Sequence, residues 1–448
     1  MREVQVARRL IALTALLPLC GHLPGMADLG AQEKVRLVLS ARGSNDDRTP
    51  DVVAEELAVI GAGAIPVLIG LVDGTALPLL MGATQEGEAI DVSDWWRGPD
   101  AFGPVAFEAL GRLPARDVLP YLAEHTDETT PLEGRLLAVR IVGRIGSADG
   151  IELLCELSSY CSDYELRYRS VCEPLERAFE RVLSGERQSV ERLRRRLDGL
   201  QHEVQAVVID AVVASGSAKG FRILETLIEG DHGPDQRVLG AVAELGDRRR
   251  WRLDDEPARL LRLYLSHADP AVRRSAAAGL ERLQDASSCR LLITLLQDES
   301  AAVRRTGLWA LRRLSGVPLD GEAGPWQAWL DEQEGWWRRE SDRLAARLDS
   351  GEEAQVLDAI RRFSERPFYR HEIALLLAGA LDHERSDVRL VACDALRRLR
   401  SSAAVPALAA QLYGSDEEVR QSAWRALCEL TGEDLPLDAR AWSSYVDD

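Results

Sequence analysis

An internal repeat constrains the fold of this chain more than any other feature. The dipeptide Val272-Arg273 belongs to a ten-residue pattern, Ala271 to Leu280, that recurs after 31 residues around Val303-Arg304. Both copies recur 116 residues further on, at Val388-Arg389 and Val419-Arg420, and in the same register Trp326 falls on Trp442. Fixed periods of this size are typical of stacked structural repeats, so the sequence predicts a duplicated array of repeats rather than one central core.

The spacing of apolar residues within each repeat predicts helices. One copy places Val303, Leu308, Ala310, Leu311 and Leu314 on one side of a 3.6-residue helix. Hydrophobic residues make up 46% of the 448 residues but aromatic residues only 5%, which suits helices built from Leu, Ala and Val. We therefore expect an all-α fold, a right-handed α-α superhelix (an α-solenoid) of about nine or ten helical pairs.

The repeat pattern Asp-x-x-x-x-x-Val-Arg-x-x-x-x-x-Ala-Leu, as in Asp298 to Leu311, resembles the HEAT repeat. The resemblance covers most of residues 50–448 and is strongest after residue 266. It implies ladders between neighbouring repeats, made by an Arg that follows the core Val and an Asp in the preceding turn. The matching positions are Arg273, Arg304, Arg389, Arg420 and Asp298. His267, His383 and Gly414 replace the Asp elsewhere, so we expect incomplete ladders and a hydrogen-bonding role for the two histidines in their turns.

The sequence as a whole predicts five segments. These are a signal peptide (1–27), a polar N-terminal segment (28–50), irregular HEAT repeats (51–235) with an insert at 73–102, a HEAT three-repeat unit (236–330) and its duplicate (331–448).

The first 27 residues are typical of a secretory signal peptide. Arg8 and Arg9 precede an apolar run from Leu10 to Leu19, and Gly25-Met26-Ala27 offers small residues for cleavage near Ala27. The run is too short to span a bilayer, which takes about 20 residues. We expect a periplasmic or secreted protein, with a lipoprotein attached at Cys20 as a less favoured alternative because the preceding Leu19 is large.

Export would expose the cysteines to an oxidising compartment. Cys155, Cys161 and Cys172 are close enough in sequence for two of them to bridge adjacent helices, so they are the candidates for one disulfide. Cys289, Cys393 and Cys428 stand at apolar helical positions, where burial is the simpler expectation.

The insert at 73–102 is the candidate for partner binding. It contains Glu88, Asp91, Asp94, Trp95 and Trp96, and long insertions in compact arrays often carry function. An insertion that is disordered or packs only on itself remains the alternative.

No motif points to catalysis, a metal or a cofactor. The histidines are scattered and form no tight set with cysteines, and Gly61-Ala62-Gly63 lacks the third glycine of a dinucleotide fingerprint. The net charge of −18 disfavours nucleic acid, whose phosphates require a basic face. It favours a partner with a basic region.

These observations favour a non-enzymatic, exported scaffold that binds a protein or peptide on its concave face. Short bacterial HEAT repeats of this style are also similar to those of phycobilin lyases and their relatives, which implies a tetrapyrrole-handling protein as the alternative. No residue of that chemistry can be matched here. A HEAT-like DNA glycosylase is a third hypothesis, and the acidic charge disfavours it.

Overall fold

The structure is a computed structural model that describes residues 30–40, 49–72, 102–185, 187–230, 233–249, 253, 255–350 and 352–447. Within these ranges the regular elements are α-helices joined by turns and short 3-10 helices, which confirms the predicted all-α fold with sequentially packed helices. The same ranges contain no single helix long and apolar enough to cross a bilayer, although Pro50–Val59 and Ala62–Val72 pass that test as a pair bent by 111°.

The helices form two compact units that divide at Ala211/Val212. Unit 1 contains α2 (Ala31–Ser40), α3 (Pro50–Val59), α4 (Ile65–Val72), α6 (Phe102–Arg112), α7 (Ala115–His125), α8 (Leu132–Ile145), α9 (Gly150–Ser159), α10 (Arg169–Ser184), α11 (Arg187–Arg194) and most of α12 (His202–Ser215). The segment 28–50 thus includes helix α2. Val35 and Leu39 lie one turn apart on this helix and are both buried, so they form its apolar side.

Unit 1 is built by helices that pack on their neighbours in sequence. Helix α6 contacts α3, α4 and α8, and α8 contacts α9 and α10. The backbones of α8 and α10 come close at Gly143 of α8, where a Cβ would lie 2.7 Å from the Cα of Ala178 in α10. A side chain at position 143 would therefore push these two helices apart.

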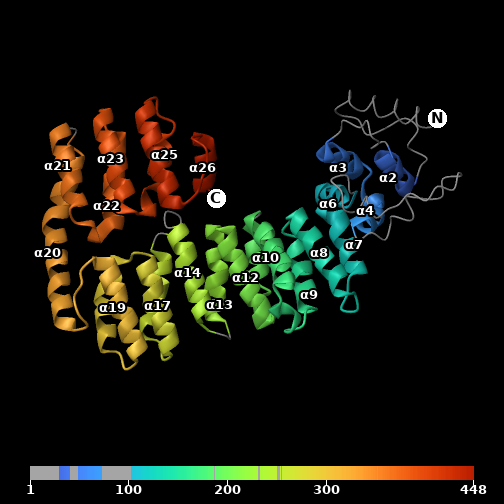
Figure 1. Cartoon of the computed structure of the whole chain (residues 1–448), viewed down its shortest axis with the longest axis horizontal. Coiled ribbons are helices and arrows are strands. Elements are labelled where there is room, and N and C mark those ends of the chain that lie inside the picture. Colours follow the sequence, from blue (N-terminus) through green and yellow to red (C-terminus); the bar gives the residue numbers. More distant parts are fainter. Residues whose placement is uncertain are drawn as a thin grey trace. The chain divides into compact units, whose positions relative to one another are not determined.

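Unit 2 follows the same principle with more regular repeats. It contains α13 (Phe221–Glu229), α14 (Gln236–Arg248), α16 (Glu256–Leu263), α17 (Pro270–Arg282), α18 (Cys289–Thr294), α19 (Ala301–Ser315), α20 (Ala323–Leu348), α21 (Glu353–Ser364), α22 (Arg370–Ala378), α23 (Ser386–Leu399), α24 (Val405–Gln411), α25 (Glu417–Thr431) and α26 (Ala439–Asp447). Helices α14, α17 and α19 stand side by side (Figure 1), as the contacts between them require.

The duplication is visible helix by helix in unit 2. A shift of 116 residues places α14, α16, α17, α18, α19 and the start of α20 on α21, α22, α23, α24, α25 and α26. Helices α19 and α25 match over their full 15 residues. Each ends at a left-handed glycine, Gly316 with φ 73° and Gly432 with φ 76°, a conformation that glycine adopts without steric cost.

The two copies also share an aromatic pair. Trp326 and Trp442 are fully buried, and their indole N–H groups donate to the carbonyl oxygens of Asp320 and Pro436 at 2.7 and 3.0 Å. Their rings meet those of Trp329 and Tyr445 edge to face at 6.0 and 5.8 Å. The same packing thus closes the third repeat of each copy.

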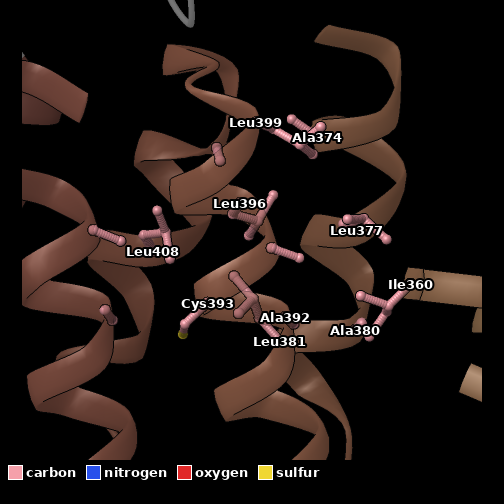
Figure 2. Packing of buried hydrophobic residues seen from close by; sticks show 14 of the residues in the cluster. Ile360, Ala374, Leu377, Ala380, Leu381, Ala392, Cys393, Leu396, Leu399 and Leu408 are labelled. Atoms are coloured by element: carbon pink, nitrogen blue, oxygen red, sulfur yellow. The ribbon is translucent and has the colours of Figure 1, made fainter. Parts of the chain in front are cut away.

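The core of the second copy is a continuous cluster between successive helices. Figure 2 shows Ala374 and Leu377 of α22 beside Leu396 and Leu399 of α23, with Leu408 contributed by α24. These side chains are between 0% and 3% exposed. Burial of each leucine contributes about 2 kcal/mol, so contacts between neighbouring helices supply most of the stability of the array.

Helix α20 joins the two copies. Its first turn holds Trp326 against the first copy, whereas Leu344 and Leu348 near its end belong to the core of the second. Between them, Trp337 lies 4.6 Å from the ring of Tyr369, and Trp336 lies under the guanidinium of Arg366. These two tryptophans, which have no counterpart in the duplicate, therefore pack where the copies meet.

Candidate functional site

The residues predicted to bind a partner, Glu88, Asp91, Asp94, Trp95 and Trp96, lie outside the described residues. The same holds for the signal segment 1–27 and for Cys20.

Arg273 connects two neighbouring repeats. Its guanidinium makes two bonds of 2.8 Å to the Asp298 carboxylate, which precedes α19, and its Nη1 donates to the carbonyl oxygens of His267 and Ala268. Both charged side chains are nearly buried, at 8% and 9% exposure. The hydrogen bonds from Arg273 lower the pKa of Asp298. The Arg and Asp of the HEAT pattern thus meet across a repeat boundary.

The other three arginines vary this arrangement. Arg304 donates to the carbonyl oxygens of Asp298 and Glu299, and Arg420 to that of Gly414. Arg389 repeats the contacts of Arg273, but its carboxylate is Asp416 at 3.3 Å rather than a residue at position 414. An aspartate two residues later therefore supplies the charge that Gly414 lacks.

The two equivalent histidines sit in the turns that these arginines close. Nδ1 of His267 accepts the backbone N–H of Asp269 at 3.1 Å, and Nδ1 of His383 accepts that of Arg385 at 3.2 Å. Each imidazole thus bonds to the turn in which it lies.

Two further arginines form ion pairs that have no signal in the repeat pattern. Arg262 of α16 is held by bidentate contacts to both Asp255 and Asp285, with the Asp285 side chain only 4% exposed. In unit 1, Arg135 of α8 reaches the carbonyl oxygens of Thr130 and Tyr160 and the Glu165 carboxylate. Both arginines bridge segments that only the folded chain brings together.

The three candidates for a disulfide lie in α9, in the turn after it and in α10. Cys155, Cys161 and Cys172 are separate thiols in the structure. The Cys172 thiol donates to the carbonyl oxygen of Leu166 at 2.7 Å, while the Cys161 thiol faces that of Leu157 at 3.7 Å. Burial raises the pKa of Cys155 to about 12 and also raises that of Cys161. The Cys161 and Cys172 thiols thus each face a backbone carbonyl oxygen of the segment that precedes them.

A basic face with one exposed tryptophan lies on α17 and α19. We define this arginine face as Arg274 and Arg282 of α17 and Arg305, Trp309 and Arg313 of α19. Arg274 and Arg282 are eight residues apart and the three residues of α19 are four apart, so those of each helix share one side of it, and all five are exposed. Among tryptophans in the described ranges, only Trp309 is exposed, at 46%.

The register between the two helices aligns these residues in rows. The 31-residue repeat sets Arg274 level with Arg305, Ala278 with Trp309, and Arg282 with Arg313. The ion pair of 3.1 Å between Arg313 and Glu281 ties the helices together at the last row.

Charge on the face is only partly compensated. Arg282 pairs with Glu244 and Asp247 of α14 at 3.7 and 3.8 Å. For Arg274 and Arg305, by contrast, no carboxylate of the described chain lies within ion-pair distance. The row formed by Arg274 and Arg305, called the upper row below, therefore presents two guanidinium groups to solvent.

The duplicate does not keep this face. The positions of Arg274, Arg305 and Trp309 are taken by Leu390, Gln421 and Arg425, and that of Arg313 by Glu429. The signal that could have revealed Trp309 was its set of equivalents, Ala278, Asp394 and Arg425, two of which are charged and indicate a solvent-facing position.

No group of His, Cys, Asp and Glu side chains that could hold a metal occurs in the part of the chain that the structure describes.

Comparison with known proteins identifies the repeats. The family model for HEAT repeats matches residues 257–324 and 373–439, one segment in each copy of the duplication. No curated protein matches the chain.

Two solved structures are similar to parts of the chain. An engineered protein is 19% identical, with 90% of this chain and 99% of that chain covered and a TM-score of 0.26. Human deoxyhypusine hydroxylase in complex with glycerol is 17% identical, with 55% of this chain and 97% of that chain covered and a TM-score of 0.25. Both TM-scores are too low for these likenesses to bear on the fold or the function.

Proposed function

We propose that this chain, a HEAT-repeat protein, is a non-enzymatic scaffold that binds a protein or peptide partner on the exposed side of its repeats. The observation that carries the proposal is the exposed Trp309 on α19, flanked by Arg305 and Arg313. Tryptophan and arginine dominate the energetics of protein interfaces, because both bury a large area and make directional contacts.

The repeat architecture supports this role. HEAT repeats mediate protein interactions in general, and stacked repeats present a long surface without needing a pocket. The ladder of Arg273 and Asp298 fixes the spacing of α17 and α19, so the face between them is preorganised.

We further propose that the protein acts in the periplasm or is secreted. This rests on the sequence of residues 1–27, with its basic start, short apolar run and small residues at 25–27. Cell fractionation of the full chain and of a chain lacking residues 2–27 tests it. Equal partitioning of both forms to the cytosol would overturn the location.

The binding role is tested by crosslinked affinity capture from native cell envelopes, followed by mass spectrometry. One dominant retained protein is the expected result, and Trp309→Ala should reduce its recovery while helical content is unchanged. Retention of nothing by a folded bait would contradict the scaffold. Visible absorbance from a copurifying pigment would instead favour the tetrapyrrole-handling alternative.

A further inference from the structure

We propose that the arginine face of α17 and α19 binds a short acidic peptide segment that also carries an apolar side chain for Trp309. The inference rests on the proposed scaffold function and names the chemical class of its partner. It differs from what the net charge alone favours, a basic partner.

The two arginines of the upper row determine which charge the bound peptide must carry. Arg274 and Arg305 hold equivalent positions on adjacent helices, and no ion pair within the described chain neutralises either. A guanidinium offers a planar pair of donors that matches a carboxylate. Two such groups left exposed on a chain with a net charge of −18 create a local basic site in an acidic surrounding.

The geometry of the row fits an extended peptide that crosses the two helices. Packed helices are spaced by about 8–10 Å. A peptide in the extended polyproline II conformation has three residues per turn and advances about 3.1 Å per residue, so carboxylates three residues apart lie on one side and span about 9 Å. A segment with acidic residues at that spacing can reach Arg274 and Arg305 together.

Trp309 supplies the apolar part of the site. It lies four residues after Arg305 on the same side of α19, about 6 Å along the helix axis. Its neighbour in the register is Ala278, a small residue that leaves the indole uncovered. An aliphatic or aromatic side chain next to the acidic residues would cover it, which gives the site a preference beyond charge.

The size of the face favours a peptide over nucleic acid. It extends for eight residues along each helix, about 12 Å, and Glu244 and Asp247 of α14 border it. A nucleic acid would carry further phosphates past this border into acidic surface. At physiological salt the repulsion from distant carboxylates is screened beyond about 8 Å, so a short acidic segment feels mainly the arginines.

The test is fluorescence anisotropy with the full chain and three labelled probes at about 150 mM salt. The probes are a 12-residue peptide with two Glu three residues apart beside a Leu, the same peptide with Lys in place of Glu, and a single-stranded DNA of similar length. We expect the acidic peptide to bind most tightly. Arg305→Glu, Arg274→Glu and Trp309→Ala should each weaken it about tenfold or more.

Arg425→Glu is the matched control. Arg425 is an exposed residue at the position of Trp309 in the duplicate, and its reversal changes the net charge by the same amount as Arg305→Glu. It should change affinity by less than about twofold. Circular dichroism and hydrogen exchange of α17 and α19 establish that each variant is folded.

Three results would overturn the inference: equal weakening by Arg305→Glu and Arg425→Glu, tighter binding of the Lys peptide or the DNA, or no binding of the acidic peptide. Affinity capture separates this failure from that of the scaffold itself. A native partner whose recovery is unaffected by Arg305→Glu would leave the scaffold intact and exclude this face as its site.

Discussion

The guanidinium of Arg249 lies 4.5 Å from the ring centroid of Tyr445, and its Nη1 donates to the Tyr445 carbonyl oxygen at 3.2 Å. Arg249 follows α14, the first helix of the duplicated array, and Tyr445 belongs to α26, the last. A second contact joins α14 to the second copy, from the Ser402 hydroxyl, which precedes α24, to the carbonyl oxygen of Asp247 at 3.2 Å. Unit 2 therefore closes on itself, with α20 at the turn between its two copies.

Tyr445→Ala should loosen this closure. The mutation removes the cation–π contact, worth about 1 kcal/mol, and leaves the backbone carbonyl in place. Backbone amides at the end of α14 should then exchange with solvent about fivefold faster by hydrogen-exchange mass spectrometry. Tyr413→Ala, a change at an exposed tyrosine of the second copy, is the control. Faster exchange in α26 with none in α14 would show that the contact does not hold the ends together.

Asp298→Asn should destabilise the junction between α17 and α19 by about 2 kcal/mol, because it removes the charge from a nearly buried pair with Arg273. Glu299→Gln, a change at the adjacent residue that is 82% exposed, should have little effect. Urea unfolding followed by hydrogen exchange in α17 and α19 measures both. Equal effects would mean that general charge, not the ladder, stabilises the junction.

The same pair predicts a dependence on pH. The pKa of Asp298 is lowered by its bonds to Arg273, so the folded state favours the ionised carboxylate. Its contribution is fully present above the ordinary pKa of about 4 and is lost as the pH falls through the lowered folded value. Stability of the wild-type junction should thus fall toward low pH more than that of Asp298→Asn. Parallel pH profiles for the two proteins would contradict this.

The fold was predictable because the sequence repeats with two periods, one of 31 residues and one of 116 residues. Val272, Val303, Val388 and Val419 are all buried, as their apolar spacing requires, and the helix boundaries recur with the same offset. The apolar spacing determines the packing of each helix pair through residues that are close in sequence. Such packing can therefore be predicted from the sequence alone.

The contacts that complete the site were not predictable in the same way. Asp416 replaces Gly414 as the partner of Arg389 because a side chain two residues away reaches the same guanidinium. The closure of Arg249 on Tyr445 depends on how α20 redirects the chain, which no local pattern encodes. Trp309 of α19 is exposed and Trp326 of α20 is buried because each helix turns a different side toward its packed neighbours, which the residue type does not reveal.

Two glycines of α14 should respond in opposite ways to alanine. A Cβ at Gly246 would lie 2.7 Å from the ring of Pro257, a buried residue that cannot move aside, so Gly246→Ala should destabilise unit 2 by about 1–2 kcal/mol. At Gly240 the added methyl group meets open space, and Gly240→Ala should stabilise the helix by about 0.5–1 kcal/mol. Urea midpoints measure both, and a shift in the same direction would refute the packing at Pro257.

Cysteine reactivity should follow burial. Burial raises the pKa of Cys393 to about 11 and also raises that of Cys289, so neither forms the reactive thiolate near neutral pH. Cys172 and Cys428 are half-buried and should react first. A short pulse of iodoacetamide followed by peptide mapping gives the order, with the urea-unfolded chain as the control in which the rates converge. Because Cys289 lies in α18, which packs on α19 of the arginine face, rapid alkylation at that position in the native protein would mean that α18 and α19 separate in solution. The preorganised face would then have to form on binding, and its affinity for any partner would fall accordingly.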